Sequence, residues 1–463
     1  MSAPDNYDTI AAIATPLGNA GIGIIRISGP GAIEIARQVF DSAQFAAPPP
    51  IPRHLYHGRI RDPLDGTLLD EVLLACMPGP HSYTGEDVVE INCHGGLTVM
   101  RAVFERVLRQ GARIAAPGEF TRRAFLNGRL DLAQAEAVID LIESRSNAGM
   151  AIAARQMTGA LSDAVARIRN ALIELRAHLE ACIDFPEDDV DTLTQDRAAA
   201  VLREQRKHLA SMIARSQHAE RYCTGIDAVI AGKPNVGKSS IMNVLLGDER
   251  SIVTSIPGTT RDVIRETVTI ADIPVRLHDT AGIHTSTDAV ETLGMDRALG
   301  HLETADITLL VFDGSRPLDN HDNMVLAKKN PLNSIALINK ADLPQELDPA
   351  DLSAFFEHEL IVTLSAKDHR GFDTLRERIA GLLQRDTATS LDEILITRLR
   401  HKQALEAALG SLRQACESLD AGGSFELISM DVHEALHSLG EITGETTAGD
   451  ILDAIFSRFC IGK

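Results

Sequence analysis

The chain has 463 residues, enough for two to four domains, and a formal net charge of −20 at pH 7. That charge argues against nucleic-acid binding over the whole surface, although it leaves room for a local basic patch. No apolar run approaches the roughly 20 residues needed to cross a bilayer, and the first residues lack the pattern of an export signal. The six cysteines have neither metal-ligand nor C-x-x-C spacing. We therefore expect a reduced, cytoplasmic protein with no membrane segment.

Residues 1–130 have the pattern of an α+β domain. Short strands are predicted over 22–27 and 88–92, and helices over 31–40 and 97–110. Arg26 and Glu90 stand out because each interrupts an apolar strand. On pattern alone, an exposed strand face or a salt bridge is the favoured interpretation of these two charges.

Residues 131–222 change to a helical pattern. Apolar residues recur at spacings of three and four and predict one stripe of a long helix, formed by Met157, Leu161, Val165, Ile168, Leu172, Leu175 and Leu179. A second helix is predicted over 195–222. Such a stripe is typical of core packing and implies no cofactor.

Residues 223–386 alternate apolar runs with helical patterns, and the runs lie at 226–231, 273–277, 306–312, 334–338 and 360–364. This alternation predicts a mostly parallel, doubly wound sheet. Helical patterns return over 387–463, with one stripe formed by Leu399, Leu405, Leu409, Leu412, Cys416 and Leu419. The two helical segments are expected to pack into one discontinuous domain, into which the doubly wound domain is inserted.

A P-loop lies near the middle of the chain, where Gly232 to Ser240 join the run at 226–231 to a helical pattern. Glycines at 232 and 237 would let backbone N–H groups surround a phosphate. Lys238 would neutralise the β- and γ-phosphates, and Ser239 would offer a hydroxyl to Mg²⁺.

Three further motifs follow in the order that a GTPase requires. Asp279-Thr280-Ala281-Gly282 would place a carboxylate near Mg²⁺ and an N–H near the γ-phosphate. In Asn339-Lys340-Ala341-Asp342, the aspartate can accept hydrogen bonds from two guanine donors, whereas adenine presents an acceptor at the same position. Ser365-Ala366-Lys367 would close over the base. Together these motifs predict guanine-nucleotide binding.

Between them, Gly258-Thr259-Thr260-Arg261-Asp262 occupies the place of a switch loop, with Thr260 as a second candidate Mg²⁺ ligand. Ile283 follows Gly282, where Ras-like GTPases carry the glutamine that orients the attacking water. Isoleucine cannot orient water, so another device for hydrolysis, or a slow switch, is expected.

These motifs resemble the MnmE (TrmE) family of tRNA uridine-modification GTPases over the whole chain. The resemblance is carried by Asn235 in the P-loop, by the Gly-Thr-Thr-Arg-Asp motif, and by the segments 83–87, 125–127, 130–137 and 459–463. It implies an N-terminal folate-binding and dimerisation domain, a discontinuous helical domain, and an inserted Ras-like doubly wound G domain. It also implies a homodimer that works on tRNA with a separate FAD-dependent partner of the MnmG/GidA type. The implied reaction adds an aminomethyl or carboxymethylaminomethyl group at C5 of the wobble uridine.

The resemblance also implies site residues. A 5-formyl-tetrahydrofolate-type cofactor would contact Arg26, Glu90, Arg129 and Lys463. Activation by K⁺ would involve Asn235, Thr254, Ile256 and Thr259. Catalytic roles would fall to Glu291, Lys238, Asp279 and Gly282, while Asp262, Arg265 and Cys460 match further residues of the family; Cys460 could equally be a small buried side chain. Residues implied in GTP binding are Asn235, Val236, Gly237, Lys238, Ser239, Ser240, Thr254, Ser255, Ile256, Pro257, Gly258, Thr259, Thr260, Asp279, Thr280, Ala281, Gly282, Asn339, Lys340, Ala341, Asp342, Ser365, Ala366 and Lys367.

The sequence leaves two other hypotheses about the function open. A ribosome-assembly GTPase would share the asparagine-containing P-loop, but such proteins append a small basic RNA-binding domain, which the charge of −20 and the long additional segments disfavour. A purely regulatory switch, with no part in one-carbon chemistry, would differ by failing to bind folate.

Overall fold

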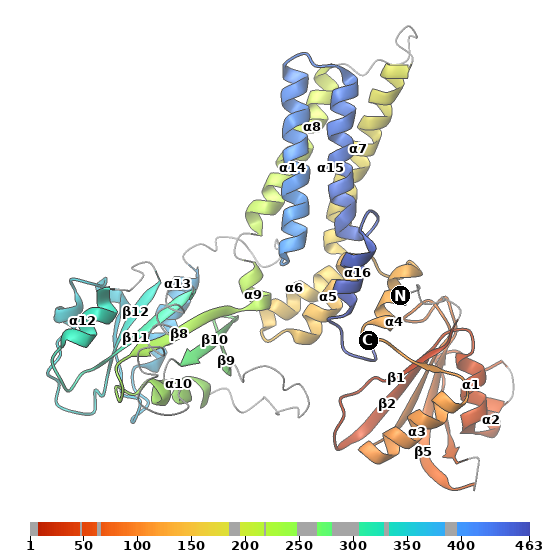
Figure 1. Cartoon of the computed structure of the whole chain (residues 1–463), viewed down its shortest axis with the longest axis horizontal. Coiled ribbons are helices and arrows are strands. Elements are labelled where there is room, and N and C mark those ends of the chain that lie inside the picture. Colours follow the sequence, from red (N-terminus) through yellow and green to blue (C-terminus); the bar gives the residue numbers. More distant parts are fainter. Residues whose placement is uncertain are drawn as a thin grey trace.

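The computed structural model describes residues 8–46, 49–62, 66–184, 195–216, 219–247, 266–279, 305–327, 333–384 and 396–463. Figure 1 shows three bodies: an N-terminal α+β domain, an upright group of long helices, and a second α/β domain. No helix in the described ranges combines the length and apolar character needed to cross a membrane.

The N-terminal domain is built on a seven-stranded sheet of order β3-β4-β5-β6-β2-β1-β7. Its strands are β1 (Ile10–Ile13), β2 (Ala20–Ser28), β3 (Phe40–Asp41), β4 (Leu55–Arg61), β5 (Leu68–Met77), β6 (Val88–Gly95) and β7 (Arg113–Ile114). All neighbours are antiparallel except β1 and β7. Helices α1 (Ala32–Val39), α2 (Ala43–Ala46) and α3 (Leu97–Arg109) accompany the sheet, and α4 (Glu119–Leu126) follows it. The strands predicted at 22–27 and 88–92 are the adjacent central strands β2 and β6.

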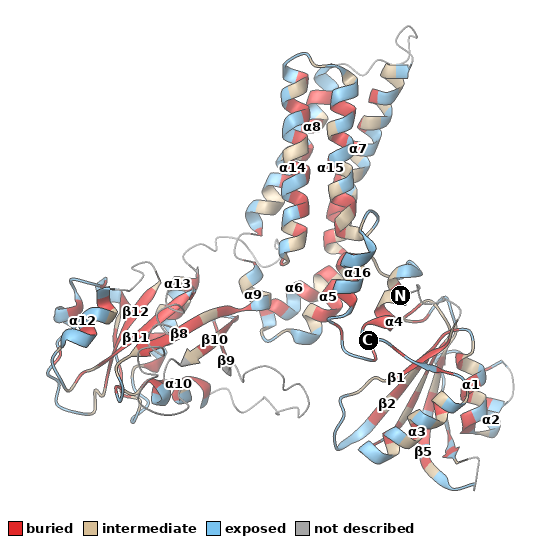
Figure 2. Cartoon of the chain, in the orientation of Figure 1, coloured by how far each residue is buried: buried red, intermediate tan, exposed pale blue. Residues whose placement is uncertain are grey.

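The helical domain has one core, formed by the chain segments that precede and follow the inserted domain in the sequence. Buried side chains between residues 133 and 209 pack with buried side chains between 396 and 442. Figure 2 shows these buried positions along the inner faces of the long helices. The helices are α5 (Leu132–Glu143), α6 (Asn147–Met157), α7 (Ala160–Asp184), α8 (Gln195–Arg215), α9 (Glu220–Thr224), α14 (Leu399–Asp420), α15 (Phe425–Thr443) and α16 (Gly449–Phe456).

The structure corrects three details of the helical prediction. The stripe from Met157 to Leu179 is not one helix, because α6 ends at Met157 and Gly159 (φ +95°) adopts the left-handed conformation before α7 begins. The helix predicted over 195–222 ends at Arg215, and α9 is separate. Leu399 was expected in the core, but it is 58% exposed at the first residue of α14.

The inserted domain is a six-stranded sheet of order β13-β12-β11-β8-β10-β9. Its strands are β8 (Ile226–Gly232), β9 (Glu266–Ile270), β10 (Ile273–Asp279), β11 (Ile307–Asp313), β12 (Ser334–Asn339) and β13 (Ile361–Thr363). Only the pair β9–β10 is antiparallel among these strands, so the predicted mostly parallel, doubly wound sheet is confirmed. Two apolar clusters lie on its faces, with α10 (Lys238–Gly247) and α13 (Phe372–Gln384) on one and α12 (Asn320–Ala327) on the other. Two short 3₁₀ helices cover Pro349–Leu352 and His358–Leu360.

Candidate functional site

The P-loop follows β8 and ends where α10 begins, as its sequence predicts. Gly232, Asn235 and Gly237 all have positive φ values, of 153°, 64° and 99°. A Cβ at Gly237 would clash with the side-chain amide of Asn339, and one at Gly232 would clash with the carbonyl of Val311. The loop therefore keeps this tight conformation only with glycine at both positions.

Lys238 is the cation of this loop, and its side chain is held within it. The Nζ donates hydrogen bonds to the carbonyl oxygens of Gly232 at 2.9 Å and Lys233 at 2.8 Å. The residue is only 7% exposed. An ammonium fixed at the N-terminus of α10 favours an anion there, because its charge adds to that of the helix dipole.

Asn339 joins the P-loop to the edge where strands β12 and β13 end. Its Nδ2 donates to the carbonyl of Val236 at 2.8 Å, and its Oδ1 accepts from the N–H of Ala366 at 3.1 Å. The residue is 3% exposed. The structure thus brings three predicted motifs together, the P-loop, Asn339–Asp342 and Ser365–Lys367, through one buried amide.

Asp342 is presented as a hydrogen-bond acceptor at this edge. The Ser365 hydroxyl donates to its Oδ1 at 3.0 Å, and the Lys367 Nζ lies 3.7 Å from its Oδ2. The hydrogen bond from Ser365 lowers the pKa of the Asp342 carboxyl below its ordinary value. The carboxylate is consequently ionised at neutral pH and able to accept from two donors of a planar base.

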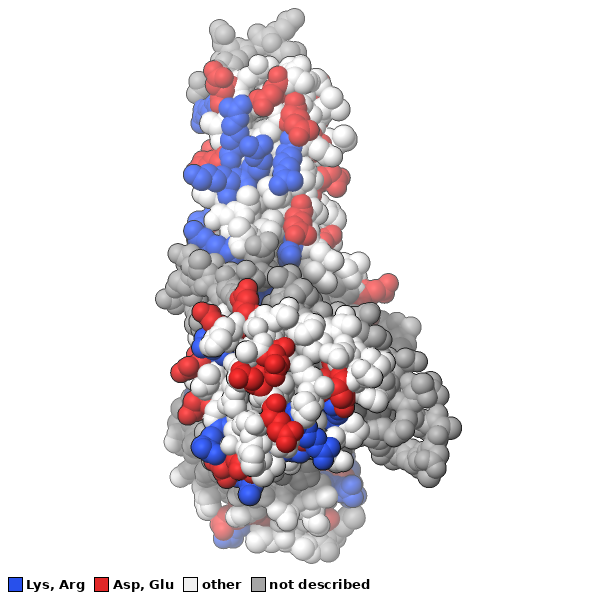
Figure 3. Space-filling view, turned by 90° about the vertical axis from the view of Figure 1, so that its left-hand side faces the viewer, with Lys and Arg blue, Asp and Glu red and all other residues white. Residues whose placement is uncertain are grey.

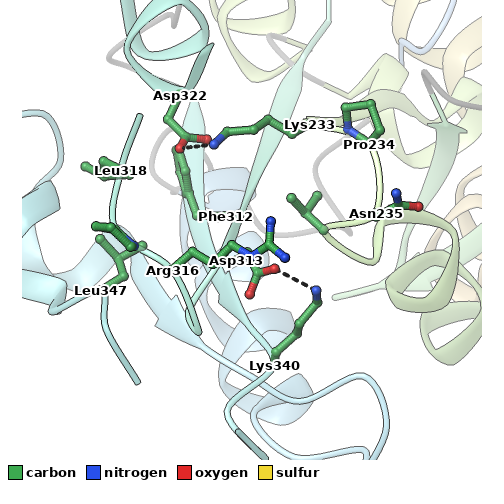
Figure 4. Close-up of a pocket in the computed structure, with 12 residues that line it drawn as sticks. Lys233, Pro234, Asn235, Phe312, Asp313, Arg316, Leu318, Asp322, Lys340 and Leu347 are labelled. Carbon is green, nitrogen blue, oxygen red and sulfur yellow. Dashed lines mark hydrogen bonds and ion pairs between the residues drawn. The ribbon is translucent and has the colours of Figure 1, made fainter. Parts of the chain in front are cut away.

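A cavity of about 160 Å³ lies beside the P-loop, between its first residues and the loop after β11 (Figure 4). Two ion pairs cross its walls, Lys233–Asp322 at 2.5 Å and Lys340–Asp313 at 2.6 Å. Burial raises the pKa of Asp313, but the hydrogen bonds from Lys340 and Ser315 together outweigh it and lower the pKa overall. Asp313 at the end of β11 and Asp322 in the first turn of α12 were not identified from the sequence, because neither belongs to a motif that indicates its partner.

Much of the predicted switch machinery lies outside the described residues. This applies to Thr254, Ser255, Ile256, Pro257, Gly258, Thr259, Thr260, Asp262, Arg265, Thr280, Ala281, Gly282 and Glu291. Asp279 is the last residue of β10, and only its backbone is described. Ser239 and Ser240 lie in the first turn of α10, next to Lys238.

A second cluster of predicted site residues lies in the N-terminal domain. Arg26 on β2 is directly opposite Glu90 on β6, and their side chains form a salt bridge of 2.8 Å. The salt bridge favoured on pattern alone is therefore confirmed. The guanidinium also lies over the rings of Tyr83 and Phe120, at 5.6 and 5.7 Å from their centroids.

The last residues of the chain complete this cluster. Arg26 donates from Nη1 to the carbonyl of Gly462 at 3.1 Å. Burial and the nearby charge of Arg26 lower the pKa of the Lys463 ammonium. Arg129 lies shortly after α4, and its Nε donates to the carbonyl of Ser82 at 3.1 Å. Cys460 is exposed, so its interpretation as a buried apolar residue is wrong.

Comparisons with known proteins agree with this architecture. Residues 9–129 match the family model of the GTP-binding protein TrmE N-terminus, and residues 132–460 match that of the MnmE helical domain. The tRNA modification GTPase MnmE of Carboxydothermus hydrogenoformans is 44% identical over 98% of this chain and 99% of its own length. That of Syntrophus aciditrophicus is 45% identical with the same coverage. A crystal structure of an Aquifex aeolicus Era variant bound to GDP.AlF4⁻ is 28% identical over 40% of this chain and 66% of that chain, with a TM-score of 0.26. The full-length matches show that the chain belongs to the MnmE (TrmE) family of tRNA modification GTPases.

Proposed function

We propose that this chain is a K⁺-activated GTPase that modifies the wobble uridine of tRNA together with an FAD-dependent partner of the MnmG/GidA type. The group added at C5 would be aminomethyl or carboxymethylaminomethyl, with its one-carbon unit supplied by a tetrahydrofolate. The main support for this proposal is the similarity of the full chain to tRNA modification GTPases. In the same chain, Asn339 links the P-loop to the motifs expected to bind guanine. A tRNA substrate would place the protein in the cytoplasm.

GTP would bind with its phosphates at the P-loop and its base at the Asp342 carboxylate. Lys238 would exchange its hydrogen bonds to the loop carbonyls for the phosphate oxygens, and Ser239 with Thr260 would hold Mg²⁺. Asn235 would contribute to a K⁺ site with Thr254, Ile256 and Thr259. A cation there would stabilise charge in the transition state, as an arginine finger does in other GTPases. Glu291 would position the attacking water.

The N-terminal cluster fits a folate in charge and polarity. Lys463 is a partly buried cation, and no ion pair joins it to a carboxylate among the described residues, so it is available to a glutamate tail. The Glu90 carboxylate can accept from N–H groups of a pterin, while Arg26 and Arg129 can donate to its acceptors. The bound folate would supply the one-carbon unit.

The N-terminal domain would also form a homodimer. Leu17, Ile22 and Leu97 are 56%, 64% and 48% exposed and lie around one shallow depression. A contiguous exposed apolar patch of this kind is typical of an interface. We place the domain boundaries at 1–130, 131–222, 223–386 and 387–463, with the second and fourth segments forming the helical domain.

The test is the modification state of tRNA in cells that lack their own copy of this GTPase. Mass spectrometry of the wobble uridine should show the C5 group restored by the wild-type chain and by Arg101→Gln, a change on the exposed face of α3. Lys238→Ala and Arg26→Ala should each leave the uridine unmodified. Restoration by both of these variants would contradict the proposal.

A further inference from the structure

The helical domain carries its charges unequally. Helix α8 has five Arg or Lys residues and two acidic ones, whereas α15 has four acidic residues and no Arg or Lys. Both helices pack against α7 and α14, so they lie at opposite corners of the four-helix group. One side of the bundle is therefore basic in a chain whose net charge is −20.

The basic side has a compact centre, the basic patch, formed by Arg203, Arg206 and Lys207 of α8 and Arg413 of α14. The ion pair between Arg203 and Asp420 at 2.8 Å fixes the level at which the two helices meet. Arg413 lies seven residues, or about two turns, from Asp420 and so faces the same way. Figure 3 shows Lys and Arg side chains gathered on this part of the bundle.

Three of these cations are not engaged by acidic side chains of the described part of the chain. Within those ranges, no ion pair joins Arg206, Lys207 or Arg413 to a carboxylate, and the only ion pair of the patch is Arg203–Asp420. Binding an anion would therefore break no described salt bridge at these three positions. Arg203 and Lys207 are four residues apart, about 6 Å along the helix axis, which is comparable with the spacing of phosphates along a strand.

We propose that the basic patch binds the phosphodiester backbone of tRNA. The proposal rests on the proposed function, which makes tRNA the substrate, and it locates the contact on a predominantly acidic chain. Cations that neutralise phosphates release counterions, and this release supplies affinity without reading the sequence. The patch would thus hold many tRNAs alike and leave the choice of nucleotide to the reaction site.

The surroundings of the patch favour RNA over an acidic protein. Among the described residues, α8 has no exposed large apolar side chain, and α14 has only Leu399 at its far end. Protein interfaces depend on such side chains as buried anchors at their centre. The acidic helix α15, in contrast, exposes Leu427 and Met430. A protein partner would find its anchors on that side of the bundle.

The experiment measures binding of end-labelled, unmodified tRNA to the full chain by fluorescence polarisation over a series of KCl concentrations. The test variant is Arg206→Gln/Lys207→Gln/Arg413→Gln. The matched control is Arg101→Gln/Arg109→Gln/Arg167→Gln, which removes three exposed arginines from α3 and α7. GTP hydrolysis and the circular dichroism spectrum of each variant establish that it is folded.

The test variant should bind tRNA about tenfold more weakly. The slope of its log affinity against log salt concentration should become less negative by about two to three, close to one for each cation removed. The control should match the wild type in both respects. Equal losses in the two variants would overturn the proposal, since net charge alone would then explain them. Unchanged affinity in the test variant, or no salt-dependent binding by the wild type, would also overturn it. None of these three results would contradict the proposed function if the wobble uridine is still modified in cells.

Discussion

Glu136 of α5 lies in a buried charged cluster that ties the first helical segment to the second. Its carboxylate accepts from Arg400 Nη2 at 2.6 Å and from His401 Nε2–H at 2.7 Å, and its side chain is only 3% exposed. Burial opposes the charge, but these partners lower the pKa of Glu136 to about 2, from an ordinary 4.5. This lowering of the pKa corresponds to roughly 3 kcal/mol of folding free energy at neutral pH. We expect Glu136→Gln to lose about that much.

The loss should depend on pH in a defined direction. Because the folded pKa lies below the unfolded one, the carboxylate stabilises the fold fully above the unfolded pKa of about 4.5, and this contribution disappears as pH falls toward 2. The difference between wild type and Glu136→Gln should therefore be largest at neutral pH and about halved near pH 3.3.

Urea unfolding followed by far-UV circular dichroism measures this difference, with attention to the transition of the long helices because the domains can unfold separately. Glu417→Gln, an exposed carboxylate of α14 with no ion pair among the described residues, is the control and should change stability by less than about 0.5 kcal/mol. A loss in Glu136→Gln below about 1 kcal/mol, or one that stays constant with pH, would refute the reasoning.

Three further predictions concern the G domain. Asp342→Asn should weaken GTP binding by several kcal/mol, because asparagine has only one acceptor oxygen and leaves one of the two base donors unpaired, and nucleotide titration should reveal a gain for xanthine nucleotides; wild-type GTP affinity would contradict the role of this carboxylate. GTP hydrolysis, but not binding, should be much faster in K⁺ than in Na⁺ at equal ionic strength, and equal turnover in the two salts would refute the K⁺ site. In the proposed homodimer, labels on the two G domains should be far apart with GDP and close with a transition-state mimic in K⁺, since tethering would give each domain a local concentration on the order of mM for its twin; one unchanged distance would exclude this closure.

The sequence predicted best where local pattern alone decides the structure. The P-loop, Asn339–Asp342 and Ser365–Lys367 follow parallel strands whose ends meet at one edge of the sheet, so their proximity followed from the motifs. Strand β9 was missed because it is a short antiparallel edge strand next to the switch segment. The break at Gly159 was missed because the apolar spacing continues through it.

Contacts between distant segments could not be predicted from spacing. The local sequence around Glu136 does not indicate that this residue contacts Arg400 and His401, which lie on a helix more than 250 residues later. The role of Asn339 as a link between the P-loop and Ala366 likewise depends on three chain segments meeting. Arg26 and Glu90 were noticed as isolated charges, but only the register of β2 and β6 places them opposite each other.

Because the core of the helical domain is shared between two distant chain segments, it can form fully only after the second segment has been synthesised. Helices α7 and α8 leave the ribosome before the inserted domain, whereas α14 begins 215 residues after α7 ends, at Leu399 against Asp184. At roughly 5–20 residues per second, the early hairpin must wait about 10–40 s for the helices that cover it. During that interval the apolar stripe of Leu161, Leu172 and Leu179 has only part of its final packing. Chaperone capture of nascent chains should therefore peak while the G domain is being translated, and a G domain that folds promptly would bring α14 to its place soonest.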